Sequence, residues 1–141
     1  MTVVPIMGQI TTLARDFPNG VLISKSSHHL KWEMDVVPTP NSRTYRIRME
    51  YSIGAPPRVR VIVPSVLPKA PGKDFLPHVF STEKQQICLY YGKFWEWNPS
   101  MLLSRKIVPW AAEWLFYYEL WVLTGEWLGG GIEHGSRRED T

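Results

Sequence analysis

Three consecutive segments in the first half of the chain alternate apolar with polar residues. Apolar residues occupy every second position over 30–36, 45–51 and 59–63. The intervening stretches 38–41 and 54–57 are rich in proline, glycine and asparagine. Period-2 alternation interrupted by such turns is typical of an antiparallel meander with one buried face. This feature restricts the chain to folds in which another layer covers that face.

The covering layer is predicted in the second half of the chain. From about Pro109 to Leu123, aromatic residues recur at helical spacing: Trp110, Trp114, Tyr117, Tyr118 and Trp121. Such a stripe predicts a helix that packs on the sheet, and core packing explains it better than a ligand cage. Pro109 suits the first helical turn and Gly125 suits the end. A short helix is also predicted over Gln9–Asp16, so the expected fold class is α+β.

Length and composition indicate one globular domain. The chain has 141 residues, of which 44% are hydrophobic, and we expect a domain over 1–131 followed by a flexible tail over 132–141. A single cysteine favours a reducing, cytoplasmic setting, and no signal-peptide pattern opens the sequence. The apolar stretch Ile107–Leu123 contains two glutamates, which argues against a membrane span.

An ordered set of residues surrounds the single cysteine, Cys88. His78 lies ten residues before it, at the end of a proline-rich stretch over 64–80. Ile87 and Leu89 flank the cysteine, and a Trp97-Asn98-Pro99 step follows before the predicted helix. This order resembles the core of ubiquitin-conjugating (E2) enzymes, which carry a His-Pro-Asn segment, an Ile-Cys-Leu step, a Trp-Ser-Pro turn and a helix. The resemblance covers roughly residues 9–123 and implies the ubiquitin-conjugating fold.

The residues of the predicted aromatic helix make the resemblance more specific. The run from Ile107 to Trp121 and the Thr-Gly-Glu-Trp-Leu-Gly-Gly-Gly ending are similar to the short stand-alone E2-like proteins of bacterial CBASS anti-phage operons. That resemblance implies an acyltransferase that forms a thioester with the C-terminal glycine of a cGAS-like nucleotidyltransferase. It also implies a possible E1-like activator, no cofactor or metal, and no direct nucleic-acid or membrane partner. The usual C-terminal helices of eukaryotic E2 enzymes are not expected.

The resemblance also suggests roles for individual residues. Cys88 would be the thioester nucleophile, because a thiolate accepts and releases acyl groups readily. His78 would shape the catalytic loop. Because neighbouring residues of an extended chain point to opposite faces, Ile87 and Leu89 would anchor the segment while Cys88 points outward. The expected partner-binding residues are Tyr90, Trp95, Trp97, Asn98 and Pro99.

Two positions depart from the family pattern. Val79 and Phe80 stand where E2 enzymes have the Pro and Asn of the His-Pro-Asn segment. That Asn helps to stabilise the oxyanion, and Gln85, Gln86 or Asn98 would have to supply an amide in its place.

The same residues are compatible with other interpretations. Cys88 could be a core residue, and the protein a non-catalytic adaptor that binds and regulates the nucleotidyltransferase. The adjacent pair His28-His29 is better explained as a surface pair than as a metal site.

Residues 1–62 carry eight Lys/Arg against four Asp/Glu, and a strand face rich in arginine could bind nucleic acid. The arginines concerned are Arg46, Arg48, Arg58 and Arg60. Cross-strand pairing with Glu33, Asp35 and Glu50 is the favoured explanation of that face.

Overall fold

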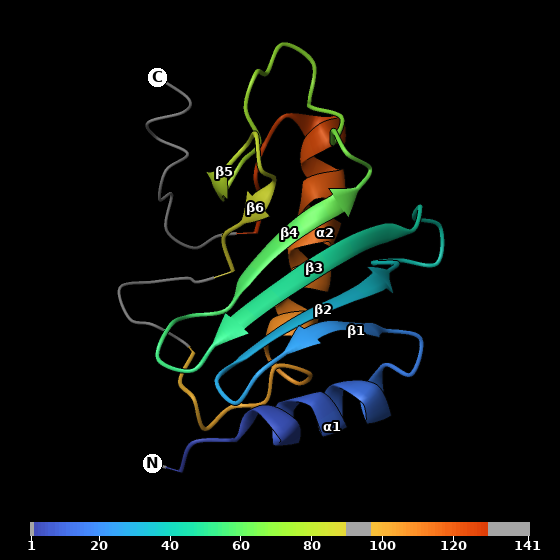
Figure 1. Cartoon of the computed structure of the whole chain (residues 1–141). Helices are drawn as coiled ribbons and strands as arrows, with labels where there is room; N and C mark the ends of the chain where they lie inside the picture. The colour runs from blue at the N-terminus through green and yellow to red at the C-terminus, as the bar shows by residue number, and fades with distance from the viewer. Residues whose placement is uncertain (1, 90–96, 130–141) are drawn as a thin grey trace.

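The computed structural model describes residues 2–89 and 97–129. The predicted contacts Tyr90 and Trp95, and the predicted tail over 132–141, therefore lie outside the described residues. Within the described ranges, a helix is followed by six strands and a second, longer helix. Figure 1 shows the sheet in front of the long helix.

The sheet is antiparallel throughout, and its strand order is β1-β2-β3-β4-β6-β5. The predicted meander is confirmed as β2 (His29–Val36), β3 (Tyr45–Ser52) and β4 (Arg58–Val63). Its alternation is clearest in β3, where every second side chain is buried from Tyr45 to Tyr51. The sheet thus has an inner, apolar face and an outer, polar face, as period-2 patterning requires.

Three further strands have no clear alternation in the sequence. β1 (Val21–Lys25) is an edge strand whose side chains are mostly exposed, so neither face of it is consistently apolar. β5 (Val79–Ser81) and β6 (Gln86–Ile87) form a hairpin too short to establish a period. β6 also pairs with β4, which attaches the hairpin to the meander. The end of the predicted irregular stretch over 64–80 is therefore strand.

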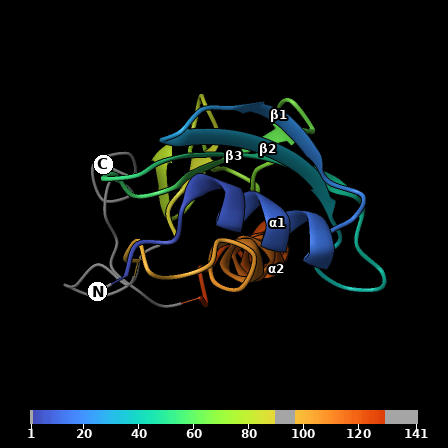
Figure 2. The ribbon, with the colours of Figure 1, turned by 60° about the horizontal axis from the view of Figure 1, so that its bottom comes forward.

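Both predicted helices are present. α1 (Ile6–Asp16) begins three residues earlier than predicted, and α2 (Ile107–Thr124) places Pro109 in its first turn. Figure 2, in which α2 is seen almost end-on, places both helices on the same side of the sheet. Gly125 ends α2 in the left-handed conformation (φ 79°), and its N–H donates to Trp121 O at 2.7 Å.

Three of the five residues in the predicted aromatic stripe of α2 belong to the core, since Trp114, Tyr118 and Trp121 are buried. Trp110 and Tyr117 are half-buried. Tyr118 meets Tyr45 of β3 edge to face, with ring centroids 6.3 Å apart. The Tyr45 hydroxyl donates to Glu119 at 2.7 Å, which adds a polar tie between sheet and helix. No helix in the described part of the chain has the length and apolarity needed to cross a membrane.

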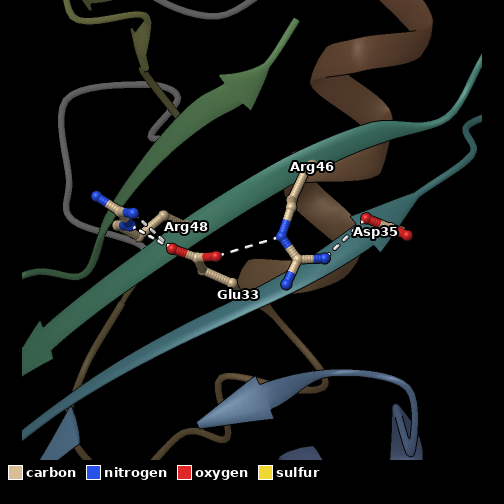
Figure 3. Close-up of polar contacts among 4 residues, drawn as sticks. All are labelled: Glu33, Asp35, Arg46 and Arg48. Atoms are coloured by element: carbon tan, nitrogen blue, oxygen red, sulfur yellow. Dashed lines mark hydrogen bonds and ion pairs between the residues drawn. The ribbon is translucent and has the colours of Figure 1, made fainter. Parts of the chain in front are cut away.

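The outer face of the sheet carries the cross-strand ion pairs that the sequence favours (Figure 3). Glu33 of β2 accepts from Arg46 at 3.2 Å and from Arg48 at 2.6 Å. Arg46 also pairs with Asp35 at 3.0 Å, and Arg58 pairs with Glu50 at 3.6 Å. This pairing neutralises the arginines of β3 and leaves no continuous basic stripe along that strand.

Candidate active site

The hairpin β5–β6 brings His78 and Cys88 together. His78 directly precedes β5 and Cys88 directly follows β6. The Cys88 N–H donates to the His78 carbonyl at 3.2 Å. The same carbonyl accepts the indole N–H of Trp114 at 2.9 Å. One backbone carbonyl therefore links the cysteine segment to the centre of α2.

The backbone and ring of His78 are both constrained. Its φ of 50° lies in the left-handed region, which side-chain-bearing residues rarely adopt. Its ring is buried and stacks on Trp127, with centroids 5.4 Å apart and planes inclined by 23°. The positive φ and the stacking on Trp127 therefore restrict both the backbone and the ring of His78.

Cys88 does not point outward, which corrects the expectation from alternation. Its side chain is fully buried, as are those of Ile87 and Leu89. Alternation fails here because β6 ends at Ile87, so Cys88 and Leu89 are not held in a regular strand. The thiol can react with a protein substrate only if the surrounding structure opens.

The three amides considered as substitutes for the missing Asn have different surroundings. Gln85 is buried, and its amide nitrogen donates to Val61 O at 2.9 Å and Pro64 O at 3.1 Å. Its amide oxygen accepts the N–H of Leu67. With both ends engaged, the Gln85 side chain anchors the proline-rich loop and is not available to an oxyanion. Sequence reasoning missed this anchoring role, because no pattern distinguishes Gln85 from its neighbour.

The other two amides are more accessible. Gln86 is half-buried and lies on the outer face of the sheet, where it is opposite Arg60 in the pairing of β6 with β4. Asn98 is also half-buried, and its side-chain oxygen accepts from the backbone N–H of Ser100 at 2.9 Å and from the Ser100 hydroxyl. This turn holds the Asn98 amide in one orientation.

The other predicted partner contacts near Asn98 divide between core and surface. Trp97 is buried and meets Tyr51 edge to face at 5.4 Å, so most of its ring belongs to the core. Pro99 accepts the N–H of Val4 at 2.9 Å, and it lines a hollow of about 290 Å³ together with Trp97, Tyr51 and Pro56. Phe80, which replaces the family's Asn, is exposed. Among the described residues, no three His, Cys, Asp or Glu side chains are grouped as metal ligands.

Comparison with known proteins identifies one family. The model of a family described as Type II CBASS E2 protein matches residues 9–135. A comparison with curated proteins finds no match. The matched region includes the whole meander, the His78–Cys88 hairpin and α2.

Proposed function

The chain belongs to the Type II CBASS E2 family, and from that premise we propose that it carries an acyl group on Cys88 in anti-phage defence. The observation that best supports this function is the hydrogen bond from the Cys88 N–H to the His78 carbonyl. It fixes the only cysteine of the chain next to the residue that the family pattern pairs with it.

The proposed reaction has two steps. In the first, the Cys88 thiolate attacks the carbonyl carbon of an activated C-terminal carboxyl group, either an acyl adenylate or a thioester on an E1-like enzyme. The new C–S bond forms, the bond to the activating group breaks with its electron pair, and the thiol proton passes to solvent. In the second step an amine attacks the thioester carbonyl carbon, so that a C–N bond forms and the C–S bond breaks with its electron pair on sulfur. The proton lost by the amine is balanced by protonation of the departing thiolate, which gives an amide and regenerates the Cys88 thiol.

The carboxyl group in this proposal is the C-terminal glycine of the cGAS-like nucleotidyltransferase implied by the resemblance. His78 acts as a positioning residue: its carbonyl orients the Cys88 backbone, and its ring is packed against Trp127. Of the two accessible amides, we assign Asn98 the role of polarising the thioester carbonyl, because Ser100 already orients its side chain. Gln85 is excluded from this role by its three hydrogen bonds.

Burial of Cys88 adds a requirement to the proposal. The thiol is fully buried, so the acyl donor must open its surroundings before the first step. Opening of a local segment costs less free energy than global unfolding, and binding of the donor protein can supply it.

The test is co-expression with the nucleotidyltransferase encoded beside the gene, followed by non-reducing gels. Wild type should give an adduct that thiols cleave, Cys88→Ser an adduct that thiols leave intact, and Cys88→Ala none. Formation of the same adduct by Cys88→Ala would disprove the role of Cys88.

A second function is favoured by a specific observation. A buried cysteine and an exposed Phe80 in place of the family's Asn suit an adaptor that binds the nucleotidyltransferase without chemistry. In that case the two proteins would co-purify without an adduct, and Cys88→Ser would retain full pathway function.

A further inference from the structure

Two adjoining hollows lie on the outer face of the sheet beside β6. They have volumes of about 330 and 260 Å³, and Glu50, Arg58 and Gln86 line both of them. We call the combined feature the β6 groove. One half of it is cationic and the other is apolar.

The cationic half contains Arg58, Arg60 and Lys84. Its one lining carboxylate, Glu50, is already paired with Arg58 at 3.6 Å. Within residues 2–89 and 97–129, no ion pair involves Arg60 or Lys84. Arg60 stands directly opposite Arg48 across the β3–β4 pairing, but Arg48 is already paired with Glu33, which leaves the charge of Arg60 uncompensated across the strands. An anion in this half of the groove could pair with Arg60 and Lys84, which both line it.

The apolar half contains Phe80, Ala55 and Pro56. Phe80 is 43% exposed although it is a large aromatic residue on a strand. Aromatic residues are enriched at protein interfaces because they offer a large rigid contact area. The half that contains Phe80 therefore suits an apolar side chain of a partner.

The groove lies close to the proposed nucleophile along the chain. Gln86 is two residues before Cys88, and Phe80 is two residues after His78. In extended chain, two residues span roughly 7 Å. A peptide seated in the groove would thus lie beside the segment that carries Cys88.

We propose that the β6 groove binds an extended acidic peptide segment, with a carboxylate at Arg60 and Lys84 and an apolar side chain against Phe80. The inference deepens the proposed function and rests on it: the peptide belongs to the protein whose carboxyl terminus Cys88 accepts. A nucleic acid fits less well, because Arg46 and Arg48 are occupied by Glu33 and the adjoining surface is apolar.

A peptide-binding measurement tests the groove separately from any reaction at Cys88. The Cys88→Ala protein is titrated with a fluorescein-labelled octapeptide of glutamate, leucine and glycine. Matched probes replace glutamate by lysine, or the peptide by oligothymidylate. Only the acidic peptide should bind, and added salt should weaken it.

Three variants locate the binding. The pair Arg60→Glu with Lys84→Glu should weaken the acidic peptide by roughly tenfold or more, since it replaces attraction by repulsion. Phe80→Ala should weaken it by roughly fivefold through lost apolar contact. Lys106→Glu, an exposed charge at the start of α2, should leave it unchanged. Circular dichroism of each variant checks that the fold is retained.

Each contrary outcome overturns the inference. Absence of binding, equal binding of the lysine peptide, or binding unaffected by the paired charge reversal would each remove the acidic-peptide site. Tighter binding of oligothymidylate that the charge reversal abolishes would make the groove a nucleic-acid site instead.

The gel experiment separates the groove from the acyl-transfer function. If wild type forms the thiol-sensitive adduct at the same rate as Arg60→Glu/Lys84→Glu, and peptide binding is also unchanged, the groove fails and acyl transfer stands. If wild type forms no adduct while the charge reversal still abolishes peptide binding, acyl transfer fails and the groove stands as a peptide site.

Discussion

Gln85 and Gln86 carry the same side chain in adjacent positions but have different surroundings. The Gln85 amide is buried and bonds to Val61, Pro64 and Leu67, whereas Gln86 is half-buried on the outer face. Gln85→Leu would leave buried backbone groups without partners, so we expect the free energy of unfolding to fall by about 2–4 kcal/mol. The matched control Gln86→Leu should cost less than about 1 kcal/mol. Urea denaturation measures both, and equal losses would contradict the anchoring role of Gln85.

The burial of Cys88 predicts slow reaction with alkylating reagents. Since the side chain is fully buried, we expect iodoacetamide to modify the native protein roughly a hundredfold more slowly than the protein in urea. Trp127→Ala should raise the native rate, because it removes the ring that stacks on His78, whose carbonyl holds the Cys88 N–H. Mass spectrometry of quenched samples gives the rates. A native rate equal to that in urea would show that the thiol is already accessible.

At the scale of elements, the β2–β3 ion pairs make stability depend on pH. Burial raises the pKa of Glu33, but the hydrogen bonds and charges of Arg48 and Arg46 outweigh that effect and hold the pKa below its ordinary value of about 4.5. A carboxyl group whose pKa is lower in the folded protein than in the unfolded protein stabilises the fold at pH values above its pKa in the unfolded protein. That contribution is lost as the pH falls through the folded pKa.

We therefore expect Glu33→Gln to be less stable than wild type by about 2 kcal/mol near neutral pH. The difference should shrink as the pH falls below about 4.5, because the wild-type carboxyl then becomes neutral as well. Asp35→Asn is the control. Asp35 shares its partner Arg46 with Glu33, and the Asp35 side chain is 58% exposed, so this substitution should lower the free energy of unfolding by less than about 1 kcal/mol. Urea denaturation across the acid range compares the three proteins, and a difference that grows toward low pH would refute the assignment.

The end of α2 depends on one backbone conformation. Gly125 has φ 79°, and a Cβ built there would meet nothing within 4 Å. Gly125→Ala should therefore cost about 1 kcal/mol through backbone strain alone. Gly125→Asn should cost less, because asparagine adopts the left-handed region more readily. Thermal unfolding followed by circular dichroism compares the two, and a larger loss for Asn would contradict the strain argument.

The elements that the sequence predicts are those with enough residues to show a period. The alternation that gives β2, β3 and β4 extends over 30–36, 45–51 and 59–63, and the aromatic stripe of α2 extends from Trp110 to Trp121. β1 was not predicted because its side chains are mostly exposed at an edge. β6 has only two residues, and it is a strand because it pairs with β4 on one side and β5 on the other. That pairing arises from the tertiary structure, so the local sequence could not predict it.

At the scale of the whole molecule, the candidate site was only partly predictable. The approach of His78 and Cys88 follows from local sequence, since the ten-residue separation spans one hairpin. The burial of that hairpin does not, because Trp114 and Trp127, which secure His78, come from the far end of the chain. The β6 groove combines residues from β3, β4 and the hairpin, so no single segment could indicate it.

Three buried phenols connect the packing of the whole molecule to alkaline pH. Burial raises the pKa of Tyr45, Tyr51 and Tyr118, and the hydrogen bond to Glu119 raises that of Tyr45 further. A phenol whose pKa is higher in the folded protein than in the unfolded protein stabilises the fold at pH values below its ordinary pKa of about 10. Above that value the unfolded phenols ionise first, so stability is progressively lost as the pH rises.

The free energy of unfolding should therefore fall above about pH 10 by up to about 1.4 kcal/mol per pH unit for each phenol. Tyr118→Phe should make this slope shallower, while the exposed control Phe116→Tyr should leave it unchanged. Urea unfolding at several alkaline pH values gives the slopes, and phenolate absorbance of the native protein reports which tyrosines ionise. If all six tyrosines of the chain ionised before the fold was lost, the buried phenols could not be what limits its stability in alkali.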